Sequence, residues 1–367
     1  MFLLVSFLNS NIASKETKLD PEKQILDEKS KLNYVSTVSS VKKQTEAVVA
    51  EKNTGKVAGA SVAGGKVYLG FAFESRSVAR VNQVQGQIGR AFPLYMTYLQ
   101  WGNPQNSTIN SAFFSVFNST GTIPIISWEP WSPFNGVNQP DYKLSNIANG
   151  NFDSYVKNSA LAIKAYNKPV FLRFAHEMNG NWYPWGGTVN GNSASDYITA
   201  YRHVHDIFAQ NGVGNVTWIW CPDTWSFPQF NGNNISDYYP GSGYVDWVGL
   251  DGYNFGNSKA GQKWKSFTEL FSPGYKQVSG YNKPIMIAET ASSESGGNKA
   301  SWIASTFDRE IPQNFPRIKA VIWFDINKET DWDLASSPTS MSQFKNSVAN
   351  DIYKPTPVIS NAKIISP

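Results

Sequence analysis

The sequence is poor in the residues that form disulfides and bind metals. Cys221 is the only cysteine among 367 residues, which excludes an intrachain disulfide and a cluster of thiolate ligands. The only histidines are His176, His203 and His205. His203 and His205 lie two positions apart in a predicted helix, so their side chains point in different directions and are poor ligands for one ion. We therefore expect no metal site.

Charged residues are also scarce. Asp, Glu, Lys and Arg make up 16% of the chain, and the formal net charge is +4 at pH 7. Residues 1–60 and 61–367 share this small excess evenly, so neither part is expected to form a broadly basic surface. Aromatic residues make up 14% and include 13 tryptophans, a balance unlike that of a nucleic-acid-binding protein. We expect no nucleic-acid partner.

The first 61 residues differ in composition from the rest. Phe2 to Leu8 form a short apolar run without a preceding basic residue. We interpret residues 1–14 as the remnant of a signal peptide and predict an extracellular, secreted protein without a membrane span. Residues 15–61 contain no Trp or Phe and end in a Gly/Ala-rich tract, which is typical of a linker or mobile arm with little regular structure.

Residues 62–355 alternate between apolar, strand-like runs and helical segments, the pattern of repeated βαβ units. The eight strand-like runs begin at Val67, Pro93, Ile123, Pro169, Val216, Val245, Pro284 and Ile318. Helices are expected near residues 75–89, 108–117, 154–166, 195–210, 262–277, 299–309 and 341–352. Eight such strands favour a closed (β/α)8 TIM barrel, an α/β fold of about 250 residues, over an open sheet.

Two segments do not fit the alternation. Residues 226–244 are rich in Asn, Gly and Tyr where a helix between the fifth and sixth strands is due, and they are predicted to be a long loop. Residues 356–367 follow the last helix and are interpreted as a C-terminal tail.

The chemistry of such a barrel lies at the C-terminal ends of its strands. The acids at the predicted strand ends are Glu129, Glu177, Asp223, Asp251, Glu289 and Asp325. Eight of the 13 tryptophans lie at or just after these ends: Trp101, Trp128, Trp131, Trp182, Trp185, Trp220, Trp225 and Trp323. Aromatic faces stack on the apolar C–H faces of sugar rings, so this clustering predicts a ring-lined, sugar-binding cleft.

The run from Pro169 to Gly187 carries the strongest signal. Its first residues, PVFLRF, are expected to form a buried strand. Continued alternation places Arg173 of this strand and Glu177 beyond it on one face, and His176 on the other. Burying an unpaired charge is unfavourable, so Arg173 predicts an anionic partner nearby.

Two glutamates form the best candidate pair for hydrolysis of a glycosidic bond, which needs one carboxyl that keeps its proton and one that stays ionised. Glu177 follows the fourth strand, and Glu289 lies on the seventh. Closure of the barrel brings both residues to one rim. Arg173 should favour the ionised form of Glu289, and Tyr253 can donate a hydrogen bond to it. Carboxyls about 5 Å apart give retention of anomeric configuration, whereas about 8 Å gives inversion.

Several of these runs together resemble a known family. RFAHEMNGNWYPWGG resembles glycoside hydrolase family 26, and WIWCPD, VDWVGLDGYN, KPIMIAETAS and IKAVIWF resemble its later strand ends in the same order. The likeness covers about residues 62–353, and a histidine before the acid/base glutamate, as in His176–Glu177, is the form of this family. The resemblance implies a (β/α)8 barrel, a retaining mechanism and no cofactor.

The resemblance also implies roles for individual residues. Glu177 would be the acid/base and Glu289 the nucleophile. His176 and Arg173 would organise them, and Tyr253 would be the hydrogen-bond partner of the nucleophile.

Sugar-binding residues are expected around this pair. The resemblance makes Trp182 and Trp323 sugar platforms. The strand-end pattern adds five candidates for substrate binding: Trp128, Glu129, Trp185, Trp225 and Asp251. An alternative in which Glu129 or Asp251 is the true acid, with Glu177 in support, stays open.

The resemblance implies an endo-acting enzyme that cleaves β-1,4 linkages in plant-type polysaccharide, with mannan endo-1,4-β-mannosidase first. WYPW looks slightly closer to the branch that cleaves mixed-linkage β-1,3-1,4-glucan, a lichenase, which is the alternative. A hypothesis of another class is a catalytically inactive carbohydrate-binding barrel. Binding alone does not need two acids organised by Arg173 and Tyr253, so this hypothesis is disfavoured. We expect a monomer whose partner is a β-linked polysaccharide or oligosaccharide.

Overall fold

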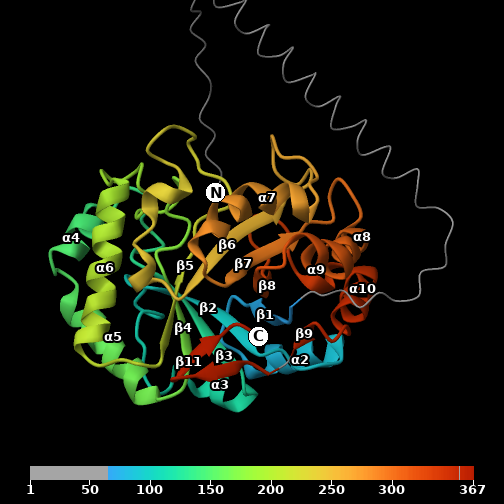
Figure 1. Ribbon diagram of the computed structural model, residues 1–367, viewed down its shortest axis with the longest axis horizontal. Coiled ribbons are helices and arrows are strands. Elements are labelled where there is room, and N and C mark those ends of the chain that lie inside the picture. Colours follow the sequence, from blue (N-terminus) through green and yellow to red (C-terminus); the bar gives the residue numbers. More distant parts are fainter. Residues whose placement is uncertain (1–64, 355) are drawn as a thin grey trace, which may run out of the picture. The chain divides into compact units, whose positions relative to one another are not determined.

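The protein is described by a computed structural model that covers residues 65–354 and 356–367 (Figure 1). The described residues belong to one compact unit. The interpretations of residues 1–14 as a signal-peptide remnant and of residues 15–61 as a linker concern segments outside the described residues. Within the described ranges, no helix is both long and apolar enough to cross a membrane.

Eight parallel strands form a closed barrel. They are β1 (Val67–Ala72), β2 (Leu94–Gln100), β3 (Ile123–Glu129), β4 (Val170–Phe174), β5 (Val216–Trp220), β6 (Trp247–Asn254), β7 (Ile285–Ser292) and β8 (Ile318–Phe324). Each strand pairs with the next, and β1 pairs with both β8 and β2, which closes the ring. The predicted (β/α)8 barrel is confirmed, and every predicted strand begins within two residues of an observed one.

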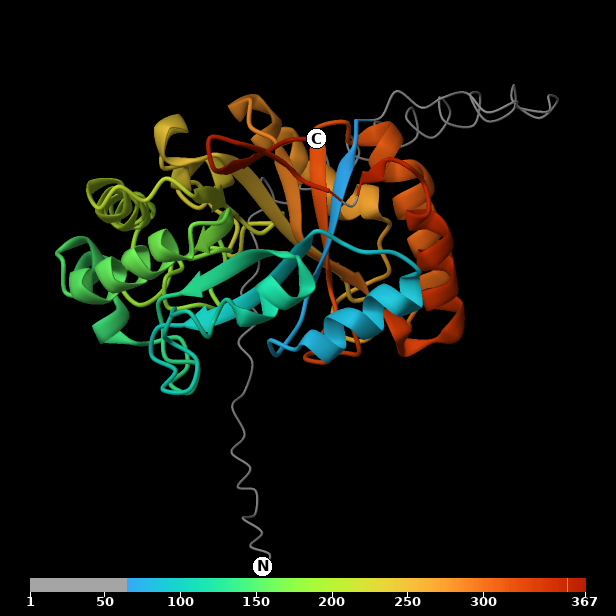
Figure 2. The ribbon, with the colours of Figure 1, turned by 90° about the horizontal axis from the view of Figure 1, so that it is seen from below.

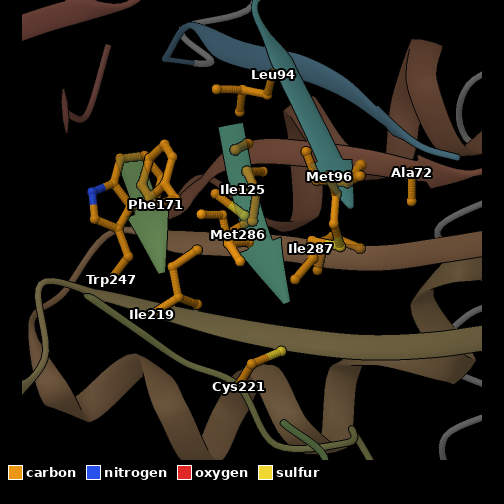
Figure 3. Close-up of a cluster of buried hydrophobic side chains, with 14 of the residues drawn as sticks. Ala72, Leu94, Met96, Ile125, Phe171, Ile219, Cys221, Trp247, Met286 and Ile287 are labelled. Atoms are coloured by element: carbon orange, nitrogen blue, oxygen red, sulfur yellow. The ribbon is translucent and has the colours of Figure 1, made fainter. Parts of the chain in front are cut away.

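The barrel interior is apolar at the strand starts. Figure 3 shows Met96, Ile125 and Met286, from three strands, in one buried cluster. Trp247, at the start of β6, packs edge to face against Phe171 of β4, with ring centroids 5.4 Å apart. Strands buried on both faces consist mainly of Val, Ile, Leu and aromatic residues, which explains why they were predictable from composition.

Helices cover the outside of the barrel. They are α2 (Val78–Ile88), α3 (Ser115–Thr120), α4 (Leu144–Ala148), α5 (Asp153–Tyr166), α6 (Ala194–Gln210), α7 (Phe267–Val278), α8 (Lys299–Ala304), α9 (Ile311–Asn314) and α10 (Pro338–Val348). In Figure 1, α4, α5 and α6 lie on one flank and α8, α9 and α10 on the other, and the perpendicular view of Figure 2 keeps these groups apart. Each predicted helical region overlaps a helix, although α3 shares only residues 115–117 with the region predicted at 108–117, and the short α4 and α9 were not predicted.

Local sequence explains where the longest helix begins. Ser193 precedes α6 and accepts a hydrogen bond from the backbone N–H of Asp196, whose carboxylate accepts one from the N–H of Ser193 in return. This capping box satisfies backbone donors that have no partner within the helix. Tyr197, Tyr201 and Val204 then recur at helical spacing and pack against the barrel.

The segment between β5 and β6 is the predicted long loop. Between these strands, all within the described residues, only two 3-10 turns occur, η2 (Ile235–Tyr238) and η3 (Ser242–Tyr244). Asn179 anchors the loop: its side chain donates to the carbonyl of Asp223 at 2.9 Å, and its carbonyl accepts from the N–H of Phe227 at 2.9 Å. The loop is therefore fixed to the segment that follows β4.

The last residues are more structured than a tail. Strand β9 (Tyr353–Lys354) pairs with β1, and β10 (Val358–Ser360) and β11 (Lys363–Ile365) form an antiparallel hairpin. The backbone of Ile364 accepts a hydrogen bond from Trp247 Nε1 at 3.1 Å and donates one to Thr217 Oγ1 at 3.0 Å. Both partners lie at strand starts, so the hairpin covers the end of the barrel opposite to the strand ends. Composition did not show this, because the contacts depend on the positions of individual residues, among them the buried side chain of Ile364.

That side chain gives a stability prediction. Ile364 is 2% exposed, whereas its neighbour Ile365 is 43% exposed. Ile364→Ala should lower the free energy of unfolding by about 2–5 kcal/mol through lost burial and the cavity left behind. Ile365→Ala is the matched control and should change it by less than about 0.5 kcal/mol. Urea unfolding measures both, and equal values for the two variants would contradict the role of the hairpin.

Candidate active site

The backbone changes direction where β4 ends. Ala175 and Glu177 have φ values of 48° and 54°, in the left-handed region that is uncommon for residues with a side chain. The N–H of Ala175 donates to the carbonyl of Trp128, and that of Glu177 donates to the carbonyl of Cys221, which holds this conformation between β3 and β5. The predicted alternation beyond Phe174 is therefore wrong. His176 does not point away but lies buried in the barrel, with Nδ1 3.4 Å from Ser127 Oγ.

Arg173 occupies the centre of the site. Its guanidinium is fully buried and donates to Asp251 Oδ2 on β6 at 2.6 Å, to Glu289 Oε1 on β7, and through Nε to Ser127 Oγ on β3 at 3.0 Å. The predicted anionic partner of Arg173 is thus present twice. Two carboxylates and one guanidinium neutralise much of each other's charge, which lets all three be buried.

Three donors contact the carboxyl group of Glu289. Its Oε1 accepts from Arg173 and from the hydroxyl of Tyr98 at 2.8 Å, and its Oε2 accepts from the hydroxyl of Tyr253. Hydrogen bonds and an ion pair to the charged form of a carboxyl favour that form. The predicted contact between Tyr253 and Glu289 is confirmed.

Glu177 has the opposite environment. One hydrogen bond reaches it, from Trp182 Nε1 to Oε2 at 2.5 Å. Burial raises the pKa of Glu177 well above its ordinary value, and the negative charges of Asp251, Asp223 and Glu289 raise it further. These effects favour the protonated form of Glu177, whereas Glu289 is paired with a cation.

Gly180 leaves room for the indole ring of Trp182, which contacts Glu177. A Cβ on Gly180 would lie 2.4 Å from an atom of the Trp182 indole, so any larger residue would push this ring away. Trp182 is 38% exposed, lies on the rim and keeps one face open to solvent.

Two aspartates surround the pair in different ways. Asp251 is fully buried under Arg173, so its predicted role in substrate binding is wrong, and it positions the guanidinium instead. Asp223 lies at the surface of the groove, and burial raises its pKa to about 7. Glu129 does not line the groove. Its Oε2 accepts hydrogen bonds from Gln100 and from Nε1 of Trp131, and Trp131 does line the groove.

Three of the predicted sugar-binding tryptophans are wrong. Trp128, Trp185 and Trp323 are fully buried and cannot stack on a ligand. Trp128 and Trp323 point outward from their strands to the helices, because the neighbouring residues Ser127 and Phe324 point inward. Trp185 donates from Nε1 to the carbonyl of His176 at 2.6 Å and stacks on Tyr183.

A groove of about 720 Å3 lies over these residues. Both Glu177 and Glu289 line it, together with Tyr253. Its aromatic walls are Trp131, Trp182, Tyr183, Trp225, Phe227, Phe255 and Phe324. The predicted ring-lined cleft is present, but it uses three of the eight strand-end tryptophans. The predicted Trp225 is 40% exposed in the wall.

Sequence reasoning missed Tyr98. It lies on β2, whose end carries no acid, so that strand gave no reason to examine it. Its alternation within LYMTYLQ could have shown that Tyr98 shares the inward face with Met96 and Leu94.

A metal ion has no open position among the acids. Among the described residues, one group of side chains could hold a metal ion: atoms of His176, Asp251 and Glu289 that can act as ligands lie within 4.8 Å of one another. The Arg173 guanidinium already donates to both of these carboxylates. Burial lowers the pKa of His176, and the charge of Arg173 adds to this effect, so the imidazole is neutral. The arrangement is suited to organising carboxyl groups rather than to binding a cation.

Comparison with known proteins identifies the family. A sequence model of glycosyl hydrolase family 26 matches residues 133–347, more than half of the chain. The chain belongs to glycosyl hydrolase family 26. The residues that carry the predicted resemblance, including Arg173 to Gly187, lie within the match.

Individual relatives agree with this family. The chain is 37% identical to endoglucanase H of Acetivibrio thermocellus over 286 residues, which are 76% of this chain and 30% of that protein. It is 24% identical to mannan endo-1,4-beta-mannosidase of Bacillus subtilis over 310 residues, 76% of this chain and 77% of that protein. The chain thus spans less than a third of the first relative and about three quarters of the second.

Solved structures support the fold. The catalytic domain of a family 26 endo-beta-1,4-mannanase from Bacillus sp. JAMB-750 superposes with a TM-score of 0.60 at 21% identity, covering 79% of this chain and 87% of that domain. At this identity the likeness shows the barrel and no more.

The electrostatics give a prediction for Glu177. Its pKa is raised in part by the negative charge of Asp223, so Asp223→Asn should lower the pKa of Glu177. Glu177 would then lose its proton at a lower pH. A 13C NMR titration of glutamate carboxyl carbons, with Glu177→Gln to assign the signal, measures this change. Asp308→Asn, at an exposed position of the π-helical segment η5 (Ser305–Glu310), is the control and should leave the titration unchanged. An unchanged or higher midpoint in Asp223→Asn would contradict the coupling.

Proposed function

We propose that the chain is a retaining endo-β-glycanase that cleaves β-1,4 linkages in a mannose-based or glucose-based polysaccharide. One observation carries the proposal: a groove lined with aromatic rings contains two carboxyl groups in opposite environments. Glu177 is buried beside negative charges that raise its pKa, and Glu289 forms an ion pair with Arg173. These environments favour the two protonation states that double displacement at an anomeric carbon requires.

In the first step, Glu177 donates its proton to the glycosidic oxygen while that oxygen leaves the anomeric carbon. The carboxylate of Glu289 attacks the same carbon and forms a covalent glycosyl ester. In the second step, water gives a proton to ionised Glu177 and attacks the anomeric carbon, which breaks the ester. Glu177 is then protonated and Glu289 ionised, as at the start.

The neighbouring residues support this division of roles. Arg173, Tyr98 and Tyr253 align the Glu289 carboxylate, and they would stabilise its return as a leaving group in the second step. Asp251 is buried and paired with Arg173, so it is not the acid, and Glu129 does not line the groove. The inactive carbohydrate-binding barrel is not favoured, because a binding protein has no use for this arrangement.

The comparisons support two polymers. Five of the named relatives are mannan endo-1,4-beta-mannosidases, which keeps mannan as a candidate. The relative at 37% identity is named an endoglucanase, and this specific observation favours a β-glucan, including the mixed-linkage type, as the second candidate. A polymeric substrate also supports secretion as part of the proposal, since polysaccharides do not cross membranes.

The two glutamates should respond differently to replacement. Glu289→Ala removes the nucleophile and should lower kcat by on the order of 10^4 or more, while binding of the polysaccharide in affinity electrophoresis persists. Glu177→Ala should retain cleavage of aryl glycosides whose leaving group needs no proton, and added azide should restore turnover by replacing the water. Glu74→Ala, at an exposed position after β1 that does not line the groove, is the control. Unchanged reducing-sugar release from Glu289→Ala would refute the proposal.

Product analysis tests the substrate and the mode of attack. We expect β-mannan or barley-type β-glucan, offered in parallel with xylan, to lose viscosity faster than reducing ends accumulate, because internal cleavage shortens long chains first. Sizing the products by chromatography identifies the preferred polymer. Release of a single sugar as the only early product would contradict endo action.

A further inference from the structure

Three lysines line the groove beyond the glutamates. Lys259 and Lys265 lie in the segment between β6 and α7, and Lys328 follows β8. Because β6, β7 and β8 are neighbours in the barrel, these side chains flank the strand that carries Glu289. A groove for an uncharged polymer does not require ammonium groups.

Two of these lysines form no ion pair. Lys328 Nζ lies 3.1 Å from Glu329 Oε1, so its charge is balanced by its neighbour. Within the described residues, neither Lys259 nor Lys265 forms a salt bridge. The other acids of the groove do not compensate for them: Glu289 is paired with Arg173, and Glu177 holds its proton. The positive charge of Lys265 acts to lower the pKa of Asp223, but these two described side chains form no salt bridge.

Aromatic rings hold these two ammonium groups at the groove wall. Lys259 Nζ lies 4.8 Å from the centroid of the Phe255 ring, and Lys265 Nζ lies 5.4 Å from that of Trp225. Phe255 and Trp225 also line the groove. A cation over a ring face is attracted to it, which keeps the side chain near the ring and leaves its remaining N–H donors available. Each ring and lysine together present an apolar face for a sugar and a charge for a substituent.

We propose that Lys259 and Lys265 form a subsite for carboxylate groups carried by the polysaccharide, so that the enzyme favours glycans with acidic side groups such as hexuronic acids. The inference rests on the proposed function and extends it to the class of substituent. A carboxylate beside an ammonium at a partly exposed site contributes modestly, so the subsite should act on preference rather than on turnover itself.

The test compares charged and neutral substituents on one backbone. Glucomannan contains both glucose and mannose, so either backbone specificity permits cleavage. The probes are carboxymethyl glucomannan and hydroxyethyl glucomannan of equal substitution, and the measured quantity is the ratio of their kcat/KM values. We expect this ratio to exceed one at low salt and to fall towards one in 1 M NaCl, where the screening length is about 3 Å.

The double variant Lys259→Gln/Lys265→Gln should lower the ratio by about threefold to tenfold, given the modest strength of exposed ion pairs. The double arginine variant preserves both charges and should keep the preference. Lys263→Gln is the matched control, because Lys263 is exposed in the same segment but does not line the groove.

The outcomes separate the two proposals. A parent ratio at or below one, a ratio insensitive to salt, or an unchanged ratio in the double glutamine variant would each overturn the acidic subsite while leaving the glycanase proposal intact. Failure to cleave unsubstituted glucomannan, β-mannan and β-glucan would instead refute the proposed function.

Discussion

The buried guanidinium of Arg173 is the contact on which the site depends. It lies on β4 and bonds to side chains of β3, β6 and β7, so it ties the register of distant strands to one charge. Without it, Asp251 and Glu289 would be two acidic groups buried side by side, an arrangement that is strongly unfavourable. The same cation therefore joins the C-terminal ends of these strands and aligns the carboxyl group of Glu289. The contacts of Arg173 thus contribute both to the stability of the barrel and to the chemistry of the site.

Glu177 differs from Glu289 mainly because the backbone takes it out of reach of that cation. After the left-handed residues that follow β4, its carboxyl group accepts a hydrogen bond from Trp182 rather than from Arg173. Burial and three neighbouring negative charges then favour its protonated form. The two glutamates thus differ in their environments because only Glu289 contacts Arg173. The left-handed backbone at Ala175 and Glu177 is the local cause of this difference.

The sequence predicted what depends on composition and repetition: eight apolar runs, the helices between them, the long loop after β5, and acids at strand ends. It failed where one residue's orientation decides the outcome. The alternation that should have placed His176 outward ended with the strand at Phe174, three residues before Glu177, to which it was assumed to extend. Trp323 lies one position from the groove residue Phe324, and Trp128 lies one position from the inward-facing Ser127. A net charge near zero also concealed two unpaired lysines, because a total says nothing about where charges gather.

The lone cysteine has a practical consequence. Cys221 is buried between Arg173 and Asp251, and burial raises the pKa of its thiol well above the ordinary value. Maleimides react with thiolates that are exposed enough to attack them, so the folded protein should be almost inert to these reagents. A cysteine introduced on the surface would then be the one thiol that reacts with such a reagent. Spectroscopic probes could thus be attached at chosen points along the groove without first removing a native residue.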